Sequence, residues 1–144
     1  MSDLEIKVVS YETSWNEIKA IRRAVFQEEQ GVDEALEFDG LDAGATQFLA
    51  YWQGNAVGTA RMRNLDDSTV KIERLAVLKA ARGRGIGSQL MRKAIALAKE
   101  GGRDRAVVNA QEYVKQLYEN LGFEAVGELF EEAGIPHIKM VLKF

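Results

Sequence analysis

The sequence predicts an α/β fold (an α+β mixed sheet), in which helices flank a central sheet of parallel and antiparallel strands. Three strand-like segments in residues 46–78 are separated only by short turns, so we expect an antiparallel meander. A long amphipathic helix, residues 86–100, separates the last of these strands from a further strand at 105–110. A strand that follows such a crossover is expected to pair parallel with the one before it, which makes the sheet mixed.

The N-terminal part predicts one strand and one helix. Residues 5–9 alternate between apolar and polar side chains, as in a half-buried strand. Ser14 and Glu17 have the spacing of a capping box, and we expect a helix over 15–27. Its apolar residues recur at helical spacing: Trp15, Ile18, Ile21 and Val25. The loop 30–45, which overlaps the acidic segment 28–42, is long for a plain connection, and this length favours a functional loop.

The elements after this loop follow from turns and helix stops. The meander consists of strands 46–52, 56–65 and 69–78. The helix 86–100 stops at Gly101 and Gly102, and a shorter helix, 113–121, stops at Gly122. Strands are expected at 105–110, 123–129 and 137–144, the last two joined by a loop at 131–134. Because no repeat or linker divides the chain, we expect a single domain over residues 1–144.

Composition excludes several classes of site. The chain has no cysteine and a single histidine, so a disulfide, a thiolate zinc site, a thiol nucleophile and a histidine-rich metal site are excluded; we expect no metal. The N-terminus lacks a signal peptide, and no apolar run approaches the roughly 20 residues of a membrane span. These features predict a cytoplasmic protein without membrane contact. The net charge of −3 argues against nucleic-acid binding.

Charge is distributed unevenly along the chain. Residues 25–60 contain no Lys or Arg, whereas residues 79–99 contain six basic residues and no acidic one. Two solvated faces of opposite sign are one interpretation. The other is an anionic cofactor at the basic segment and a cationic substrate at the acidic one. The acidic side chains of the first segment are Glu28, Glu29, Asp33, Glu34, Glu37, Asp39 and Asp42.

A glycine-rich basic loop, Arg82-Gly83-Arg84-Gly85-Ile86-Gly87, opens the long helix, followed by Ser88. Glycines let backbone N–H groups approach an anion, and the first helical turn offers unsatisfied donors and a positive dipole end. We expect a diphosphate cradle, with Arg82 and Arg84 as charged partners. A flexible basic turn is the alternative. The spacing fits neither a Walker loop nor the dinucleotide fingerprint.

The pattern Arg82-x-x-Gly85-x-Gly87 resembles that of the GNAT superfamily of acyl-CoA N-acyltransferases. The central strand of the family resembles residues 72–77, and its Tyr-x-x-x-Gly-Phe motif resembles residues 118–123. Residues 25–30, 38–42, 109–111 and 134–137 are similar to the ElaA/YjcF-like branch. Gln47 departs from that branch, where histidine is often expected.

The resemblance implies the GNAT fold and transfer of an acetyl group from acetyl-CoA directly to a primary amine. The glycine-rich loop with Ser88 would bind the pyrophosphate, and the backbone of Leu75, Ala76 and Val77 would align the pantetheine arm and polarise the thioester. Asn109 would bind the cofactor arm or, alternatively, cap the helix at Tyr113.

The resemblance and the chemistry also suggest proton carriers. Tyr118 matches the general acid of the family; the alternative is an aromatic core residue. Glu73 is a candidate base, expected on the same strand face as Leu75, unless it merely faces solvent. His137 has a suitable titration range but is equally open to a structural role.

The acceptor is not specified by these motifs. We expect a small-molecule or peptide amine, attracted by the acidic segment, and a homodimer as the default state of a small enzyme. A catalytically silent acyl-CoA-binding sensor or scaffold is the rival hypothesis, and a nucleotide-binding regulator is a third.

Overall fold

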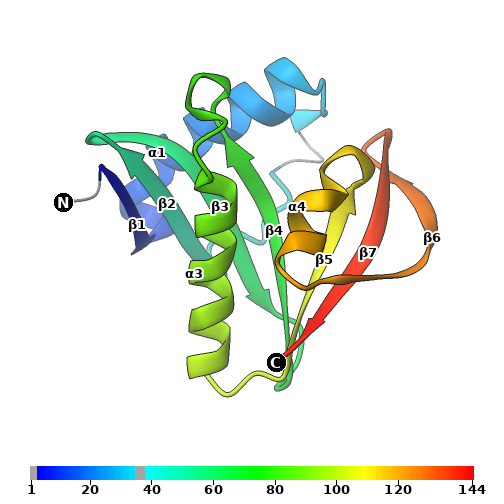
Figure 1. Cartoon of the computed structure of the whole chain (residues 1–144). Coiled ribbons are helices and arrows are strands. Elements are labelled where there is room, and N and C mark those ends of the chain that lie inside the picture. The colour runs from blue at the N-terminus through cyan, green and yellow to red at the C-terminus, as the bar shows by residue number, and fades with distance from the viewer. Residues whose placement is uncertain (1–2, 35–37) are drawn as a thin grey trace.

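The computed structural model describes residues 3–34 and 38–144, and its framework is a seven-stranded mixed sheet in the order β1-β2-β3-β4-β5-β7-β6 (Figure 1). The strands are β1 (Leu4–Val9), β2 (Thr46–Trp52), β3 (Asn55–Asn64), β4 (Thr69–Val77), β5 (Arg105–Gln111), β6 (Glu124–Glu132) and β7 (Ile135–Lys143). The helical elements are α1 (Tyr11–Arg22), the π-helical η1 (Arg23–Glu29), η2 (Lys79–Ala81), α3 (Ile86–Glu100), η3 (Glu112–Val114) and α4 (Lys115–Asn120). The predicted fold class is confirmed.

The pairing of the strands follows the predicted connections. β1, β2, β3 and β4 are antiparallel neighbours, so the meander is confirmed. β4 and β5 pair parallel across α3, but only over three residues, Thr69–Lys71 of β4 with 105–107 of β5. β7 returns between β5 and β6 and is antiparallel to both.

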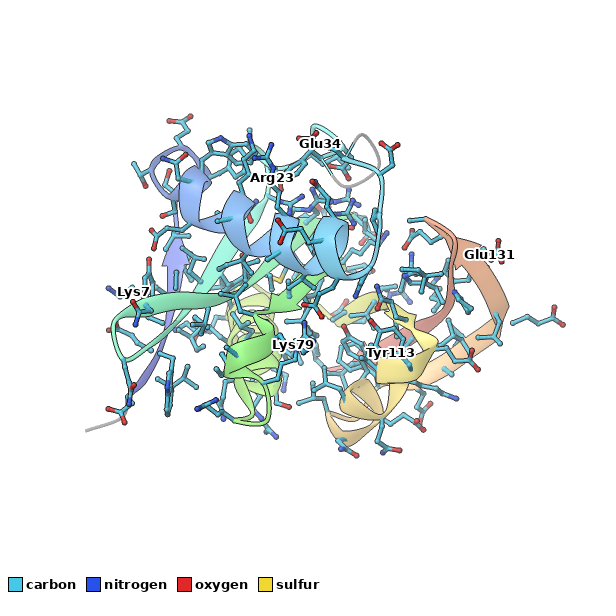
Figure 2. The ribbon with its side chains drawn as sticks, turned by 90° about the horizontal axis from the view of Figure 1, so that it is seen from above. Lys7, Arg23, Glu34, Lys79, Tyr113 and Glu131 are labelled. Carbon is cyan, nitrogen blue, oxygen red and sulfur yellow. The ribbon has the colours of Figure 1, made fainter. Side chains whose placement is uncertain are left out.

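Two apolar clusters lie on opposite faces of the sheet. The larger one packs α3 and α4 onto one face, and the smaller one packs α1 and η1 onto the other (Figure 2). Helix α3 buries the face that its period-3.6 pattern predicts: Ile86, Leu90, Met91, Ala94, Ile95 and Ala98. Burying a side chain the size of Leu or Ile contributes about 1.5–3 kcal/mol, so this face anchors the helix that follows the glycine-rich loop.

The first helix differs from its prediction at both ends. It begins at Tyr11 with Ser10 as N-cap residue, so the predicted capping box at Ser14 is wrong: the backbone N–H of Ser14 already donates to the Ser10 carbonyl within the first turn. Its last part widens into the π-helical η1, which ends at Glu29. Such π-helical segments are rare and often occur at functional sites.

The C-terminal strands are longer than predicted. β6 and β7 are joined only by Ala133 and Gly134, with φ angles of 53° and 76°. Two consecutive residues with positive φ are typical of a tight hairpin turn, so the predicted loop at 131–134 shrinks to its last two residues. This turn carries Glu132 and His137 close to the end of β5.

No helix within residues 3–34 and 38–144 is long and apolar enough to cross a membrane.

Candidate active site

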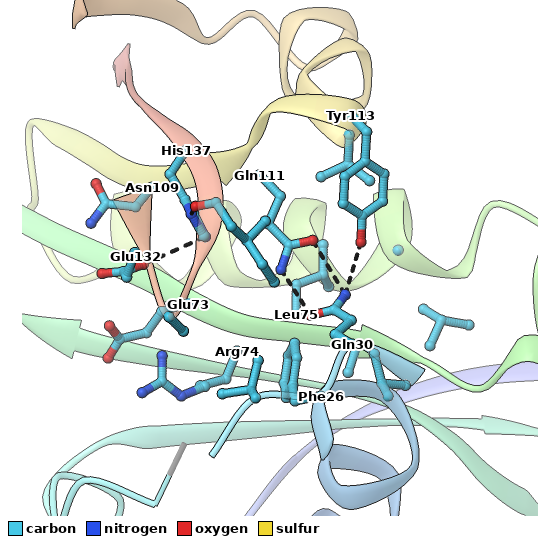
Figure 3. A pocket seen from close by; sticks show the side chains of 18 of the residues that line it. Phe26, Gln30, Glu73, Arg74, Leu75, Asn109, Gln111, Tyr113, Glu132 and His137 are labelled. Carbon is cyan, nitrogen blue, oxygen red and sulfur yellow. Dashed lines mark hydrogen bonds and ion pairs between the residues drawn. The ribbon is translucent and has the colours of Figure 1, made fainter. Parts of the chain in front are cut away.

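A cavity of about 820 Å³ lies where β4 and β5 separate. Beyond Lys71 and Val107 the two strands no longer pair: β4 continues beside β3, and β5 continues beside β7. Side chains of η1, η3, α4 and the β6–β7 hairpin complete the wall (Figure 3). Nine predicted site residues line this cavity: Glu73, Leu75, Ala76, Val77, Arg82, Gly87, Asn109, Tyr118 and His137.

A bulge in β4 changes the direction of its side chains at the cavity. Arg74 has a φ of 57°, and between the pairs of Arg61 with Glu73 and of Thr59 with Ala76, β3 advances two residues while β4 advances three. A non-glycine residue with positive φ in a central strand is unusual, and such conformations concentrate at functional sites.

The consequence of the bulge is a change of face after Arg74. Leu75 packs against the core beneath α3, whereas Ala76 belongs to the core beneath α1. Glu73 pairs with Arg61, which binds Asp42 on the α1 side. The prediction that Glu73 and Leu75 share a face is therefore wrong, because the extra residue inverts the alternation.

Arg61 is the centre of an ion network beside the cavity. Its guanidinium, fully buried, donates to both carboxylate oxygens of Asp39 at 2.9 and 3.0 Å, to Glu73 at 2.9 Å and to Asp42 at 3.2 Å. The buried Asp42 also accepts a hydrogen bond from Arg22 at 2.6 Å.

The network determines the basicity of Glu73 and the place of Gln47. Burial alone would raise the pKa of Glu73, but the hydrogen bond from Arg63 and the charge of Arg61 outweigh it and hold this pKa below its ordinary value. Glu73 lines the cavity as an ion-paired carboxylate, which makes it a weak base. Gln47 is buried and donates to the backbone carbonyl and the carboxylate of Asp42, so its contacts belong to the network.

The acidic segment is matched by arginines of the same chain. Glu29 binds Arg82, Glu34 binds Arg23, and Asp39 and Asp42 belong to the network around Arg61. These ion pairs speak against the expectation of an acidic surface that attracts a cationic substrate, because their charge is largely compensated within the chain. Glu37, predicted as part of that surface, lies outside the described residues.

The glycine-rich loop has the predicted backbone but different side-chain contacts. Gly83 and Gly85 have φ angles of 84° and 74°, and Gly85 is the N-cap residue of α3. Ile86 is buried in the core, so it offers only its backbone to a ligand. Arg82 and Gly87 line the cavity. The other predicted loop residues are not part of its lining: Gly83, Arg84, Gly85, Ile86 and Ser88.

Both arginines of the loop, predicted as charged partners of a diphosphate, are engaged by protein groups in this structure. Arg82 donates from Nε to the Val77 carbonyl at 3.0 Å and holds both carboxylate oxygens of Glu29. Arg84 lies over the ring of Trp52, 5.1 Å from its centroid, and donates to the Ala80 carbonyl. In this conformation, the anion-binding capacity of the loop resides in its backbone N–H groups and the start of α3.

Three polar side chains that sequence reasoning missed bridge the two walls. Gln30, directly after η1, exchanges hydrogen bonds with Gln111 at the end of β5, at 3.2 and 2.9 Å, and donates to the Tyr113 hydroxyl at 2.8 Å (Figure 3). Gln111 is the N-cap residue of η3, so the interpretation of Asn109 as a helix cap is wrong. Asn109 instead lines the cavity.

The two remaining predicted residues, Tyr118 and His137, are both buried at the cavity wall. The Tyr118 ring contacts the Phe123 ring edge to face, and burial, with a smaller contribution from Tyr113, raises the pKa of its hydroxyl. Nδ1 of His137 lies 2.6 Å from the Ile135 carbonyl. The cavity thus brings together a protonated phenol and an imidazole, two groups that can carry protons in a transfer reaction.

Comparison with known proteins places these features in context. The family described as "Acetyltransferase (GNAT) domain" matches residues 8–144. A Bacillus subtilis protein named "Uncharacterized N-acetyltransferase YjcF" is 34% identical over 122 residues, covering 84% of this chain and 86% of the relative. The ElaA protein of Escherichia coli is 35% identical over 124 residues, covering 83% and 81%.

Solved structures agree with the sequence comparison. The crystal structure of Escherichia coli ElaA superposes with a TM-score of 0.85 at 29% identity and covers 96% of this chain and 98% of its own. An acyl-CoA N-acyltransferase from Pseudomonas aeruginosa superposes with a TM-score of 0.84, with the same identity and coverage.

Proposed function

The chain belongs to the GNAT acetyltransferase family, in the ElaA/YjcF-like branch, and we propose that it transfers an acetyl group from acetyl-CoA directly to the primary amine of a small molecule or peptide. The observation that carries the proposal is the separation of β4 from β5, which opens a cavity running from His137 to the start of the glycine-rich loop. We infer that residues 1–144 form one acetyltransferase domain.

The donor end of the proposed site is the loop and the first turn of α3. Gly83 and Gly85 have open space where a Cβ would stand, so a diphosphate can approach their backbone closely. The 15-residue helix α3 directs its unsatisfied N–H groups and its dipole at the same place. We assign the pyrophosphate of acetyl-CoA to this end, held by the backbone.

The middle of the cavity suits the pantetheine arm and the thioester. Leu75, Val77 and Leu117 provide apolar wall there, and Asn109 provides an amide on the opposite strand. Backbone groups of β4 beyond Lys71 are released from β5 by the separation of the strands. We propose that a backbone N–H near the bulge polarises the thioester carbonyl, since a donor in a low-dielectric site stabilises the developing oxyanion.

The proposed reaction needs one proton acceptor and one proton donor. The acceptor amine loses one proton before it attacks the thioester carbon and a second one as the amide forms, and this second loss balances the proton that the departing CoA sulfur gains. Tyr118 is assigned as the donor, because its raised pKa keeps the hydroxyl protonated at neutral pH. His137 is preferred to Glu73 as the acceptor, because Glu73 is ion-paired to Arg61 and Arg63.

Free-thiol release from acetyl-CoA, measured against a panel of primary amines, tests this function. We expect turnover with at least one amine, and protection against heat by CoA that ATP does not match. Tight CoA binding without turnover across a broad panel would favour a silent acyl-CoA sensor instead. Equal protection by ATP and CoA would point to a nucleotide-binding regulator.

A further inference from the structure

Four carboxylates and one imidazole on the cavity wall are candidate proton acceptors, but most of the carboxylates are held by guanidinium groups. Glu29 is bound by Arg82, and hydrogen bonding to this arginine lowers its pKa. The hydrogen bonds from Arg61 likewise hold the pKa of Asp39 well below its ordinary value, and Glu73 is bound by the same arginine. A carboxylate with a lowered pKa is a poor base, so these three are unsuited to the task.

His137 is fixed in an orientation that defines which ring nitrogen can accept a proton. Nδ1 lies 2.6 Å from the carbonyl oxygen of Ile135, and a carbonyl only accepts hydrogen bonds. Nδ1 therefore carries the proton, and Nε2 of the neutral ring carries the lone pair. The ring stacks on Phe130, with centroids 5.9 Å apart, and this contact restricts its rotation.

Glu132 places a carboxylate beside that lone pair. Its Oε2 atom lies 3.5 Å from Nε2 of His137, within ion-pair range. The tight turn at Ala133 and Gly134 sets Glu132 opposite Ile135, which brings it to the histidine. The side chain of Glu132 is 47% exposed, whereas that of His137 is 7% exposed. A negative charge at this distance favours an imidazolium once Nε2 has taken up a proton, and the exposed carboxylate leads to solvent.

We propose that His137 and Glu132 form the proton-accepting pair for the acceptor amine, a role that rests on the proposed acetyl transfer. An N–H bond of the substrate ammonium breaks, its electron pair stays on the amine nitrogen, and the proton forms a new bond with Nε2. Glu132 is a positioning residue: it stabilises the imidazolium and then relays the proton to water. No oxidant, reductant or further reactant is required.

Other ionisable groups also face this part of the cavity. Lys71, Glu73 and Arg74 line it from β4, Asp39 from the segment before β2, and the Glu29–Arg82 pair from beside η1. Tyr113 and Tyr118 line it from η3 and α4. A substitution of Glu132 leaves the identity of all these residues unchanged, so it alters only one charge of the set.

Nitrogen-15 NMR of the imidazole tests the pair without any substrate, because the chain has a single histidine. Long-range spectra over a pH series report which nitrogen is protonated and the midpoint of protonation. We expect the Nδ1–H form in the neutral ring. We also expect Glu132→Gln to lower the midpoint, because the variant removes the carboxylate charge beside Nε2.

Glu131→Gln is the matched control, because Glu131 is its exposed neighbour on β6 and stands opposite Pro136. We expect it to leave the midpoint within about 0.2 pH units of the native value. A neutral ring protonated at Nε2 would overturn the proposal. So would an equal shift in the two variants, which would reduce Glu132 to one surface charge among others.

Two amines with the same ring test the catalytic consequence. Benzylamine is an ammonium ion at neutral pH and must lose a proton before it attacks, whereas aniline is already neutral and loses a proton only as the amide forms. With acetyl-CoA as donor, we expect Glu132→Gln to lower kcat/KM for benzylamine about threefold, with a smaller effect on aniline. Equal losses for both amines would contradict proton acceptance by the pair. If the native protein acetylates no amine, the proposed function fails, whereas the NMR result still stands or falls by itself.

Discussion

Arg82 and Glu29 join the glycine-rich loop to the opposite wall of the cavity through two hydrogen bonds, Nη1 to Oε2 at 2.9 Å and Nη2 to Oε1 at 2.6 Å. The two residues are 53 positions apart in the sequence. Because Nε of the same guanidinium holds the Val77 carbonyl, one side chain fixes the end of β4, the start of the loop and the end of η1 relative to one another.

We predict that Arg82→Lys weakens CoA binding about tenfold, because a lysine cannot make this three-way contact and a charged hydrogen bond contributes about 1.5–3 kcal/mol. Calorimetric titration with CoA measures the effect. Arg84→Lys is the control: Arg84 stacks on Trp52, and a lysine can keep a cation over that ring. Since both variants keep the positive charge, equal losses would mean that the two guanidinium groups of the loop matter alike, rather than the Arg82–Glu29 contact in particular.

Substitution of glycine by alanine is expected to have opposite effects on the unfolding free energy at two positions of the loop, Gly85 and Gly87. Gly85 has a φ of 74° and open space around it, so Gly85→Ala should cost about 1–2 kcal/mol of unfolding free energy through backbone strain alone. Gly87 lies in the first turn of α3, where an added Cβ meets only Leu75, Val77 and Leu117 at 3.9–4.0 Å. Gly87→Ala should therefore stabilise the helix by up to about 1 kcal/mol.

The binding prediction for Gly87 is the sharper one. The added methyl group would stand on the cavity wall, where a close backbone approach by the donor is proposed. We expect CoA affinity to fall at least about tenfold while thermal stability is kept. Thermal unfolding with and without CoA measures both quantities. Unchanged CoA protection in Gly87→Ala would remove Gly87 from the donor site.

The sequence predicts those parts of the molecule that depend on local patterns. The meander and α3 follow from periodicity and turn residues, and the Gly83–Gly85 backbone follows from glycine spacing. The alternation of apolar residues in β4 shifts at Arg74, since Val70 and Ile72 are followed by Leu75 and Val77, but the positive φ of Arg74 could not be predicted, because arginine has no preference for it.

Most parts of the site that could not be predicted depend on contacts between residues far apart in the sequence. The bridge between Gln30 and Gln111 joins residues 81 positions apart, and the ion pairs of the acidic segment are made with arginines on other elements. A single sequence indicates which residues are charged or polar, but their partners depend on how the strands separate and on where η1 ends. This is why the sequence could not show that arginines of the same chain bind carboxylates of the acidic segment.

Substitution of Arg61 is expected to cause a large loss of stability. Arg61→Met removes the cation that Asp39, Asp42 and Glu73 share, and breaking a buried ion pair from one side costs about 3–5 kcal/mol. Denaturant unfolding at neutral pH measures the change. Arg63→Met is the control, since Arg63 is part-exposed and binds Glu73 alone of these carboxylates, so its loss should be clearly smaller.

The same variant should change the acid sensitivity of the fold. Because Arg61 lowers the pKa of Asp39 in the folded state, the stabilisation is complete above the ordinary Asp range and is lost as pH falls toward the lowered value. The unfolding free energy of the native protein should therefore decrease as pH drops below about 4. Arg61→Met should show a shallower decrease, and parallel curves would contradict this origin.

Removal of the Tyr118 hydroxyl is expected to reduce turnover while the fold and donor binding are kept. Tyr118→Phe removes only the hydroxyl and keeps the ring against Phe123. If this hydroxyl protonates the departing sulfur, kcat should fall about a hundredfold or more while the KM for acetyl-CoA stays unchanged. Because burial raises the pKa of Tyr118, ionisation of its hydroxyl should cause no decline of native activity up to about pH 10.

The control for Tyr118→Phe is Tyr113→Phe, which loses only the hydrogen bond with Gln30 and should change kcat less than about threefold, the value of one weak hydrogen bond. A Tyr118→Phe protein with native kcat would show that the thiolate leaves without an acid from this residue. A fall in kcat/KM that came from KM alone would reassign Tyr118 to the packing of the donor channel.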